Sequence, residues 1–246
     1  VYKEFGTYLW DVAAGAAIVN AAGGKAEITN FRDNYQVDVY FSNSKIIDKS
    51  MKSIIWFRND LRIDDNSIMR AAWDKSDEVH AIFLYSKDQL EKHNEANVKL
   101  DFLVKNLNCL SDSLKELNIP LSIIDSKGFF ENPKVILKTV KERGAEQIFF
   151  NKQFGENEQK RDIEVIDLLE DSNIRAESFN DQIVYEAGTL RTGQDNPYSV
   201  FTPFKRKWVE NFDMEFLDIE HKYTPMNQGI FSSNISSFNF DFKIEH

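Results

Sequence analysis

SIIWFRNDLRIDDN, residues 53–66, is the stretch that decides the fold of this chain. It opens with an apolar run at 53–57, continues into a dense charged turn, and leads into a segment with helical spacing at 67–74. A run that is apolar throughout is typical of a strand buried on both faces, as in parallel sheets that carry helices on each side. The stretch therefore predicts the first strand and helix of an α/β domain.

The same alternation of apolar strand and helix continues to residue 179. Further apolar runs lie at 79–85, 121–125, 147–151 and 174–179, and helical spacing recurs at 95–117, 132–143 and 157–171. The longest helical segment carries one stripe of leucines: Leu100, Leu103, Leu107, Leu110, Leu114 and Leu117. We predict a doubly wound α/β domain over residues 51–212, with a five-stranded parallel sheet that binds ligands beyond the carboxyl ends of its strands.

The two flanking segments have a different character. In residues 1–50, WDVAAGAAIVNAAGG predicts a helix from Val12 to Ala22 with Asp11 as its N-cap, and strands follow at 25–29 and 37–41. Near the other end, VFTPFKRKWVENF predicts a helix capped by Thr202, with Pro203 at its first position. Residues 213–246 are polar with isolated phenylalanines, which predicts a linker or surface arm.

Composition limits the function classes. The chain has no apolar run of membrane-spanning length, so we expect a cytoplasmic protein with no membrane partner. Cys109 is the single cysteine and the four histidines are scattered, which argues against a disulfide framework or a zinc site. A net charge of −10 argues against this chain binding a DNA backbone by itself. Nothing in the sequence indicates the oligomeric state.

The charged turn has a purely structural interpretation. Asp65 or Asn66 would cap the helix that follows, and Asp60 would pair with Arg58 or Arg62 to brace the turn. Charged turns more often stabilise loops than react.

WFRNDLRIDDN (56–66) nevertheless resembles the opening signature of the DNA photolyase and cryptochrome family. FFNKQFGENEQKRD (149–162) and NPYSVFTPFKRKW (196–208) resemble later passages of that family in the same order, so that the resemblance covers roughly residues 51–230. It implies the N-terminal antenna domain of a photolyase, a Rossmann-like fold that holds a light-harvesting pigment and passes excitation to a flavin.

The resemblance also implies pigment-binding residues. Folate-type members of the family have a histidine and an Asn-Glu pair at positions that match His93, Asn157 and Glu158, which implies methenyltetrahydrofolate as the antenna pigment. A pterin presents adjacent N–H donors, and one carboxylate can accept two of them. Two alternatives stay open: His93 can be a solvated loop residue, and Glu158 can complement the positive end of a helix. A deazaflavin or flavin would use the same pocket.

In the resembled family a larger helical domain binds FAD and takes up damaged DNA, where light-driven electron transfer repairs cyclobutane pyrimidine dimers. Residues 213–246 do not resemble that domain. We therefore expect this chain to bind a pigment but not to repair DNA alone, and the choice between photolyase and cryptochrome stays open. A plain nucleotide-binding module is less favoured, because no glycine-rich loop follows residues 53–57.

Residues 1–50 resemble the C-terminal end of the inositol monophosphatase family, whose members are magnesium-dependent phosphatases. Asp11 matches a metal-holding aspartate of that family, but the other carboxylate motifs are not in this sequence, and one carboxylate cannot build a two-metal site. We expect Met51 to be the natural start of the photolyase-like part. Residues 1–50 would then be a remnant of a phosphatase, joined to the photolyase-like part by read-through of adjacent genes, by an error in sequence assembly or by a genuine fusion.

Overall fold

The computed structural model describes residues 2–22, 25–29, 32, 34–42, 51–212, 223–227 and 230–240. The chain divides into two compact units, Val1–Lys49 and Ser50–His246, and each is described by itself. Within the described residues, no helix is both long and apolar enough to span a bilayer.

The first unit is a three-stranded antiparallel sheet with one helix. Its elements are β1 (Tyr2–Tyr8), α1 (Leu9–Ala21), β2 (Lys25–Thr29) and β3 (Gln36–Ser42), and the strand order is β1-β3-β2. Val12, Val37 and Val39 form its small core. The two predicted strands are confirmed. The sequence analysis missed β1, whose pairing with β3 shifts register at a bulge that contains Gly6 at φ +68°.

The start of α1 differs from the prediction. The helix begins at Leu9, because β1 runs directly into it, and Tyr8 is the N-cap without a side-chain hydrogen bond. Asp11 lies exposed in the first turn, so the prediction that it caps the helix is wrong. Its carboxylate there still complements the positive end of the helix dipole. The predicted glycine stop, Gly23-Gly24, lies outside the described residues.

The second unit contains the predicted parallel sheet. Its strands are β4 (Lys52–Phe57), β5 (Glu78–Tyr85), β6 (Leu121–Asp125), β7 (Gln147–Asn151) and β8 (Arg175–Phe179). All neighbours are parallel in the order β6-β5-β4-β7-β8, so the chain winds outward from β4 first to one side and then to the other. The doubly wound five-stranded fold is confirmed.

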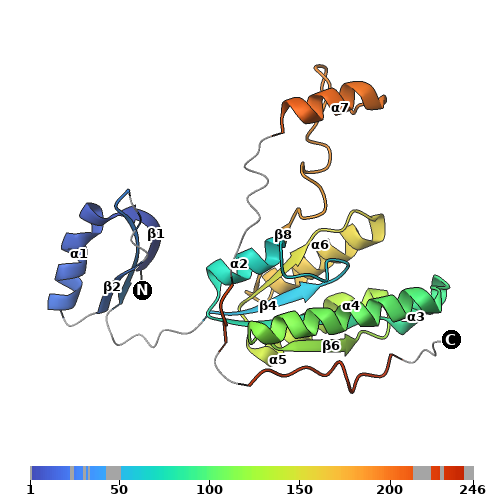
Figure 1. Ribbon diagram of the computed structural model, residues 1–246, viewed down its shortest axis with the longest axis horizontal. Helices are drawn as coiled ribbons and strands as arrows, with labels where there is room; N and C mark the ends of the chain where they lie inside the picture. The colour runs from blue at the N-terminus through green and yellow to red at the C-terminus, as the bar shows by residue number, and fades with distance from the viewer. Residues whose placement is uncertain are drawn as a thin grey trace. The chain divides into compact units, whose positions relative to one another are not determined.

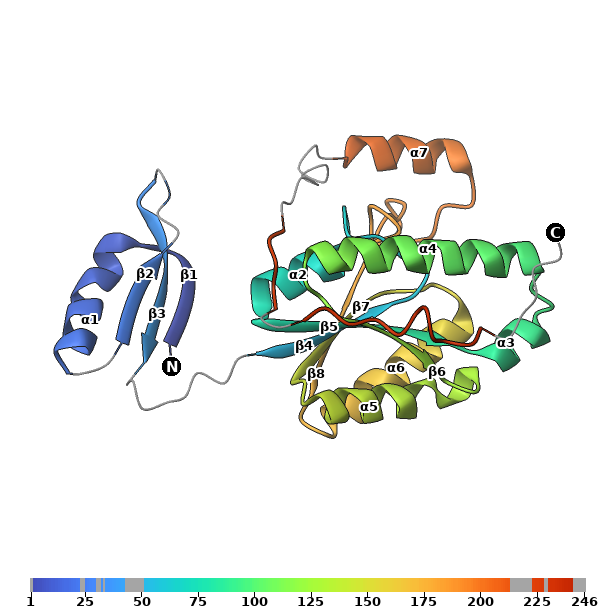
Figure 2. The same cartoon turned by 60° about the horizontal axis from the view of Figure 1, so that its bottom comes forward.

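Helices cover both faces of this sheet (Figures 1 and 2). The unit contains α2 (Ser67–Lys75), α3 (Lys87–Lys92), α4 (Asn97–Glu116), α5 (Asn132–Arg143), α6 (Glu156–Glu170) and α7 (Phe201–Glu210). Of these, α2, α4, α5 and α6 pack on the sheet, whereas α7 stands apart from it. Alternate residues of β4 enter two separate cores, as the two-residue period of a strand requires. Ile55 and Phe57 pack with α2 and α4, and Ile54 and Trp56 pack with α5 and α6.

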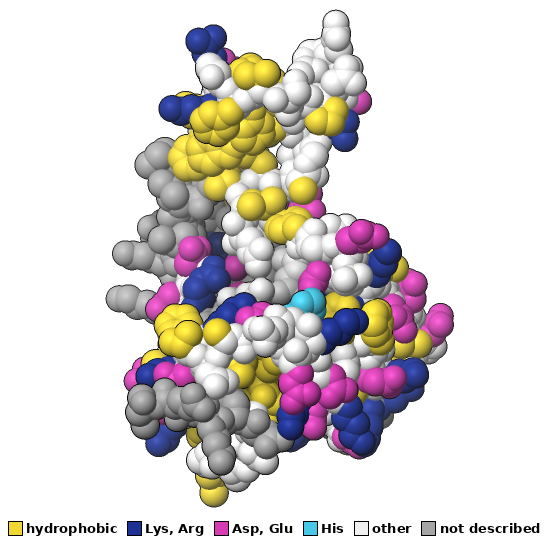
Figure 3. Space-filling model, turned by 90° about the vertical axis from the view of Figure 1, so that its right-hand side faces the viewer, with side chains coloured by type: hydrophobic (Ala, Val, Ile, Leu, Met, Phe, Trp, Pro, Cys, Tyr) yellow, Lys and Arg dark blue, Asp and Glu magenta, His cyan; other side chains and the backbone are white. Residues whose placement is uncertain are grey.

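Two helices depart from the sequence analysis. The six-residue helix α3 was not predicted, because it is short and polar. Helix α7 starts at Phe201 after an N-cap at Val200, so Thr202 is not its cap and Pro203 is not its first residue. Pro203 still lies in the first turn, where a missing N–H costs no hydrogen bond. Figure 3 shows a hydrophobic surface over α7, where Val200, Phe201 and Val209 are exposed.

The C-terminal arm, which we define as residues 223–227 and 230–240, packs along the edge of the sheet. Asn227 exchanges two hydrogen bonds with the backbone of Val79 (2.8 and 2.6 Å), and Asn234 does the same with Ile123 (2.7 and 2.8 Å). Between them, Leu121 N–H donates to Ser232 O. The asparagines therefore act as substitutes for a neighbouring strand: Asn227 beside the start of β5, and Asn234, with Ser232, beside the outer edge of β6 at Leu121 and Ile123.

Candidate functional site

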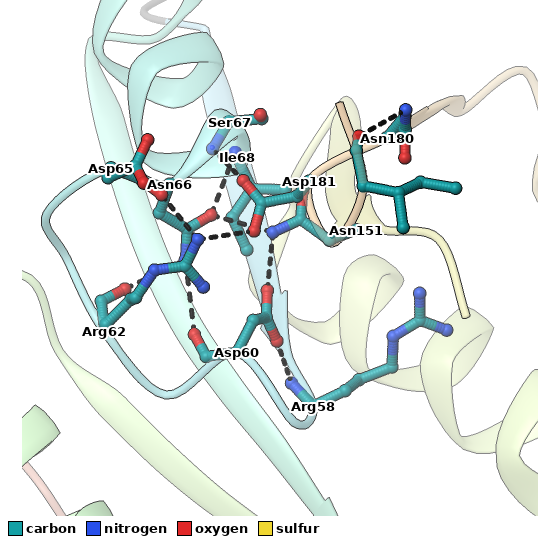
Figure 4. Close-up of polar contacts among 11 residues, drawn as sticks. Arg58, Asp60, Arg62, Asp65, Asn66, Ser67, Ile68, Asn151, Asn180 and Asp181 are labelled. Carbon is teal, nitrogen blue, oxygen red and sulfur yellow. Dashed lines mark hydrogen bonds and ion pairs between the residues drawn. The ribbon is translucent and has the colours of Figure 1, made fainter. Parts of the chain in front are cut away.

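The charged turn after β4 is part of a buried hydrogen-bond network (Figure 4). Asp60 accepts from the backbone N–H of Arg58 at 2.8 Å and from Asn151 Nδ2, at the end of β7, at 2.6 Å. Asn151 Nδ2 also donates to Asn66 Oδ1 at 2.8 Å. Asn66 in turn accepts from Ile68 N–H and caps α2. The network ties the turn to two strands and to the start of a helix.

The predicted pairing inside the turn is therefore only partly right. Of the two residues predicted to cap the helix, Asp65 and Asn66, the structure shows Asn66 as the N-cap of α2. Asp60 pairs with backbone and amide donors, whereas the side chains of the two arginines bond elsewhere: Arg58 to Asp162 and Arg62 to Asp181. Asp181 also accepts from the backbone N–H of Ser67 at 2.9 Å, which fixes the loop after β8 against the start of α2.

Arg58 is a buried cation in the wall of the site. Its Nη1 donates to both oxygens of Asp162 at 2.7 and 2.9 Å, and Arg161 bonds to the same carboxylate. The Arg58 guanidinium also lies 4.8 Å from the ring centroid of Trp56 and 5.0 Å from that of Phe150. Burial lowers the pKa of Arg58, and the Asp162 charge opposes that shift. The carboxylate and the rings together hold this charge in the interior.

A cavity of about 760 Å³ lies beyond the carboxyl ends of the strands. This is the place where doubly wound sheets bind ligands, and the volume suits a medium-sized organic ligand. Its walls come from segments that follow β4, β5, β6 and β7. The apolar part of the lining includes Phe57, Phe83, Leu100 and Leu103.

Three buried polar side chains in this lining have atoms without a hydrogen-bond partner among the described residues. They are Arg58 (Nε and Nη2), Ser86 (Oγ) and Asn132 (Oδ1), which are 6%, 7% and 5% exposed. Buried polar atoms that lack a partner cost free energy, and they are found at sites that bind something else. The cavity therefore offers donors, an acceptor and a hydroxyl group to a ligand that carries both donors and acceptors.

Two of the three predicted pigment residues line this cavity. His93, the exposed C-cap of α3, and Glu158, half-buried in the first turn of α6, both lie in its wall. Asn157 is exposed on the same turn and is not among the lining residues. The structure thus brings His93 and Glu158 to one cavity, and the ligand role of all three residues stays a prediction.

The carboxylate of Glu158 folds back over the start of its helix. A β-carbon built at Gly155 would lie 2.1 Å from Glu158 Oε2, so the glycine leaves the room that this carboxylate occupies. Lys99 and Glu95, which also line the cavity, form an ion pair at 2.7 Å. Figure 3 looks onto this end of the unit and shows acidic, basic and histidine side chains intermixed there.

Several residues that line the cavity were not predicted from the sequence. Ser86 directly follows β5, whereas Asn132 begins α5, seven positions after the end of β6 at Asp125. For Ser86, a polar residue immediately after an apolar strand was the available signal, and Asn132 had no such signal. Arg161 carried a weaker signal, because nothing in a charged helix distinguishes a buried arginine from an exposed one.

Asp11 matches a metal-holding aspartate of the inositol monophosphatase family, but we predicted no metal site for it because its partner carboxylates are not in the sequence. Within the described residues, no group of three or more His, Cys, Asp or Glu side chains is arranged to hold a metal ion. Asp11 is exposed on α1.

Comparison with known proteins places this fold. The chain is 33% identical over 159 residues to the deoxyribodipyrimidine photo-lyase of Vibrio cholerae serotype O1, a match that covers 65% of this chain and 34% of that protein. It is 30% identical over 184 residues to Cryptochrome-1 of Arabidopsis thaliana, covering 75% and 26%. The chain thus spans about a third or less of the length of these relatives.

Solved structures agree in fold. A class III photolyase from Agrobacterium tumefaciens matches with a TM-score of 0.65 at 23% identity, over 81% of this chain and 40% of that one. A photolyase from Sulfolobus tokodaii, solved with two FAD molecules, matches with a TM-score of 0.60 at 22% identity, over 79% and 42%. Residues 53–225 match the family model described as DNA photolyase. This chain belongs to the DNA photolyase family, and its α/β unit corresponds to the family's N-terminal domain.

Proposed function

We propose that the α/β unit is the light-harvesting part of a deoxyribodipyrimidine photolyase and that its cavity binds the antenna pigment. The observation that carries this proposal is the cavity itself, with apolar walls and the unpartnered polar atoms of Arg58, Ser86 and Asn132. Pterin and flavin rings are planar and carry N–H donors and carbonyl acceptors along one edge, which suits this mixture of groups. A bound pigment would absorb near-ultraviolet or blue light.

We further propose methenyltetrahydrofolate as the pigment. His93 and Glu158 on the cavity wall support it, since a carboxylate can accept two adjacent N–H groups of a pterin. Asn157 would contact the part of the pigment that extends past the rim, since it lies on the first turn of α6 beside Glu158. A flavin is the alternative, and the two FAD molecules of the Sulfolobus tokodaii photolyase, reported as implying a novel light-harvesting cofactor, favour testing it in parallel.

The test is a titration of the purified chain with methenyltetrahydrofolate, with 8-hydroxy-5-deazaflavin, with FMN and with FAD, followed by absorbance and fluorescence anisotropy. We expect methenyltetrahydrofolate to bind and both His93→Ala and Glu158→Ala to weaken it about tenfold, or about 1.4 kcal/mol each. Glu164→Ala, an exposed carboxylate on the same helix, is the matched control and should bind normally. Binding of a flavin or the deazaflavin, without binding of the folate, would overturn the folate assignment, and binding of none of the pigments would overturn the antenna proposal.

The DNA repair reaction would require the whole protein. We propose that FAD and damaged DNA are bound by regions of the family outside the matched third, and that the whole protein acts in the cytoplasm on cyclobutane pyrimidine dimers. The net charge of −10 supports the view that this chain does not bind DNA alone. A cryptochrome-type photoreceptor is the alternative for the whole protein. Light-dependent loss of dimers from irradiated DNA distinguishes the two.

The first unit has a separate proposal. We propose that residues 1–50 derive from the C-terminal end of an inositol monophosphatase-like protein and carry no phosphatase activity. The exposed position of Asp11, away from any described carboxylate cluster, supports this. Magnesium-dependent release of phosphate from a sugar phosphate, lost in Asp11→Ala, would overturn it.

A further inference from the structure

Tyr85, the last residue of β5, belongs both to the cavity wall and to the seat of the C-terminal arm. It lines the cavity and is 4% exposed. Its ring meets Phe238 and Phe240 of the arm edge-on, with centroids 5.6 and 5.3 Å away, and its hydroxyl donates to the backbone carbonyl of Phe240. One side chain thus connects a wall of the site to a segment about 155 residues later in the chain.

The two phenylalanines also pack on each other, with ring centroids 4.8 Å apart, so the three rings form one cluster. Edge-to-face pairs of this kind have a preferred geometry that restrains each ring. The same hydrophobic core contains Leu90 and Leu103, which line the cavity. The end of the arm is therefore packed against the outer side of the cavity wall.

The opposite end of the arm provides a contrast. Phe231 is also partly buried in this core, but the neighbouring Ser232 bonds to Leu121, the first residue of β6. That is the amino end of a parallel strand, the end opposite to the cavity. Tyr85 stands at the carboxyl end. Among the described residues of the arm, therefore, those near Phe238 and Phe240 lie next to the cavity wall, and those near Phe231 do not.

We infer that Phe238 and Phe240 are positioning residues for the pigment: they fix Tyr85 and so hold the cavity wall in the shape that the pigment meets. Without their rings, Tyr85 loses two aromatic neighbours, and the backbone carbonyl of residue 240 is no longer held against its hydroxyl by ring packing. If the cavity wall becomes ordered only when the pigment binds, the entropy lost in ordering it reduces the affinity. This inference rests on the proposed antenna function and adds a requirement to it, because a segment outside the βα framework becomes part of the site.

The experiment compares three variants of the whole chain in the same titration. The double variant Phe238→Ala with Phe240→Ala should weaken pigment binding about tenfold. Phe231→Ala removes the same kind of side chain from the other end of the arm, and it should lower the melting temperature while leaving pigment affinity unchanged. Tyr85→Phe keeps the ring and loses the bond to Phe240, so it should bind several-fold more weakly and is the variant least at risk of misfolding.

Circular dichroism induced in the visible or near-ultraviolet band of the pigment supplies a second measurement, since it reports the shape of the wall. It should change in the double variant and in Tyr85→Phe, and not in Phe231→Ala. Normal affinity and an unchanged band in the double variant, with pigment bound by the wild type, would overturn this inference alone. A wild type that binds no pigment would overturn the antenna function and the inference with it.

Discussion

Asn151 Nδ2 and Asp60 Oδ2 are 2.6 Å apart, although the two residues are separated by 91 positions in the chain. Both are buried. This bond joins the end of β7 to the turn after β4, the two adjacent strands from which the sheet winds in opposite directions. The residues of the family signature in this turn therefore have a structural role: they hold the turn in place where it lines the cavity.

Removing the carboxylate should show the strength of that brace. Asp60→Ala leaves the backbone N–H of Arg58 and one of the two Asn151 amide N–H groups without an acceptor, and we expect the free energy of unfolding to fall by about 2–4 kcal/mol. Urea denaturation of the purified chain measures it. Asp64→Ala, an exposed aspartate in the same loop, should change the value by less than about 0.5 kcal/mol. Equal stabilities for the two variants would contradict the role assigned to Asp60.

His80 should make the protein sensitive to acid. Its Nε2 lies 2.9 Å from Ser122 Oγ, which also accepts from Arg143. Burial, and secondarily the charge of Arg143, lowers the pKa of His80 from 6.5 to about 4. The unfolded chain therefore binds a proton at a pH where the folded chain does not, so stability falls as the pH drops from 6.5 to 4.

The expected loss from this residue is up to about 3 kcal/mol. His80→Gln should remove that part of the pH dependence, which is measured as the difference in unfolding free energy between pH 7 and pH 4.5. His93→Gln, at an exposed position, should leave the wild-type pH dependence in place. If His80→Gln and the wild type lose stability in parallel, the histidine is not responsible.

Asn234 should be the most important polar residue of the C-terminal arm. Asn234→Ala removes both hydrogen bonds to Ile123 and leaves backbone groups of the edge strand β6 unpaired. We expect a loss of about 1–3 kcal/mol in stability and faster aggregation, because open strand edges pair with other chains. Light scattering during incubation below the melting temperature tests the second effect. Ser236→Ala, at an exposed arm position, should behave as wild type.

Gly155 should control the position of Glu158 without affecting stability. Its φ of −66° is accessible to alanine, but the new β-carbon would lie 2.1 Å from the carboxylate oxygen and must displace it. We expect Gly155→Ala to keep its unfolding free energy within about 0.5 kcal/mol and to weaken pigment binding several-fold. In a Glu158→Ala background, Gly155→Ala should have no further effect on affinity. An additional loss in that background would show that Gly155 acts by another route.

The parallel sheet could be predicted from the sequence because its signals are local. The apolar runs at 121–125 and 147–151 have the same bounds as β6 and β7, and the leucine stripe of α4 is buried as its spacing indicates, with Leu103 only partly buried. Short or charge-rich elements gave no such signal. Strand β1 is interrupted by charges and by Gly6, and α3 has only six residues.

The site was predictable only to the extent that it follows from topology. His93 and Glu158 stand after strands, so the rule that ligands bind at the carboxyl edge brings them to the cavity. The bond between Asn151 and Asp60 and the contact between Tyr85 and Phe240 join residues far apart in the chain, and no periodicity encodes them. Residues 213–246, which contain the arm, were predicted as a linker or surface arm. The two asparagines that bind it to the sheet have no sequence pattern of their own.

The pairing of Asn234 with Ile123 has a consequence for how the protein is made. The two residues are 111 positions apart, so a ribosome that adds about 5–20 residues per second needs roughly 5–20 s to synthesise the second after the first. During that interval the outer edge of β6 has no cover from its own chain. We expect chaperones to bind the nascent chain at this stage. Synonymous codons that slow translation between residues 125 and 234 should therefore lower the yield of native protein.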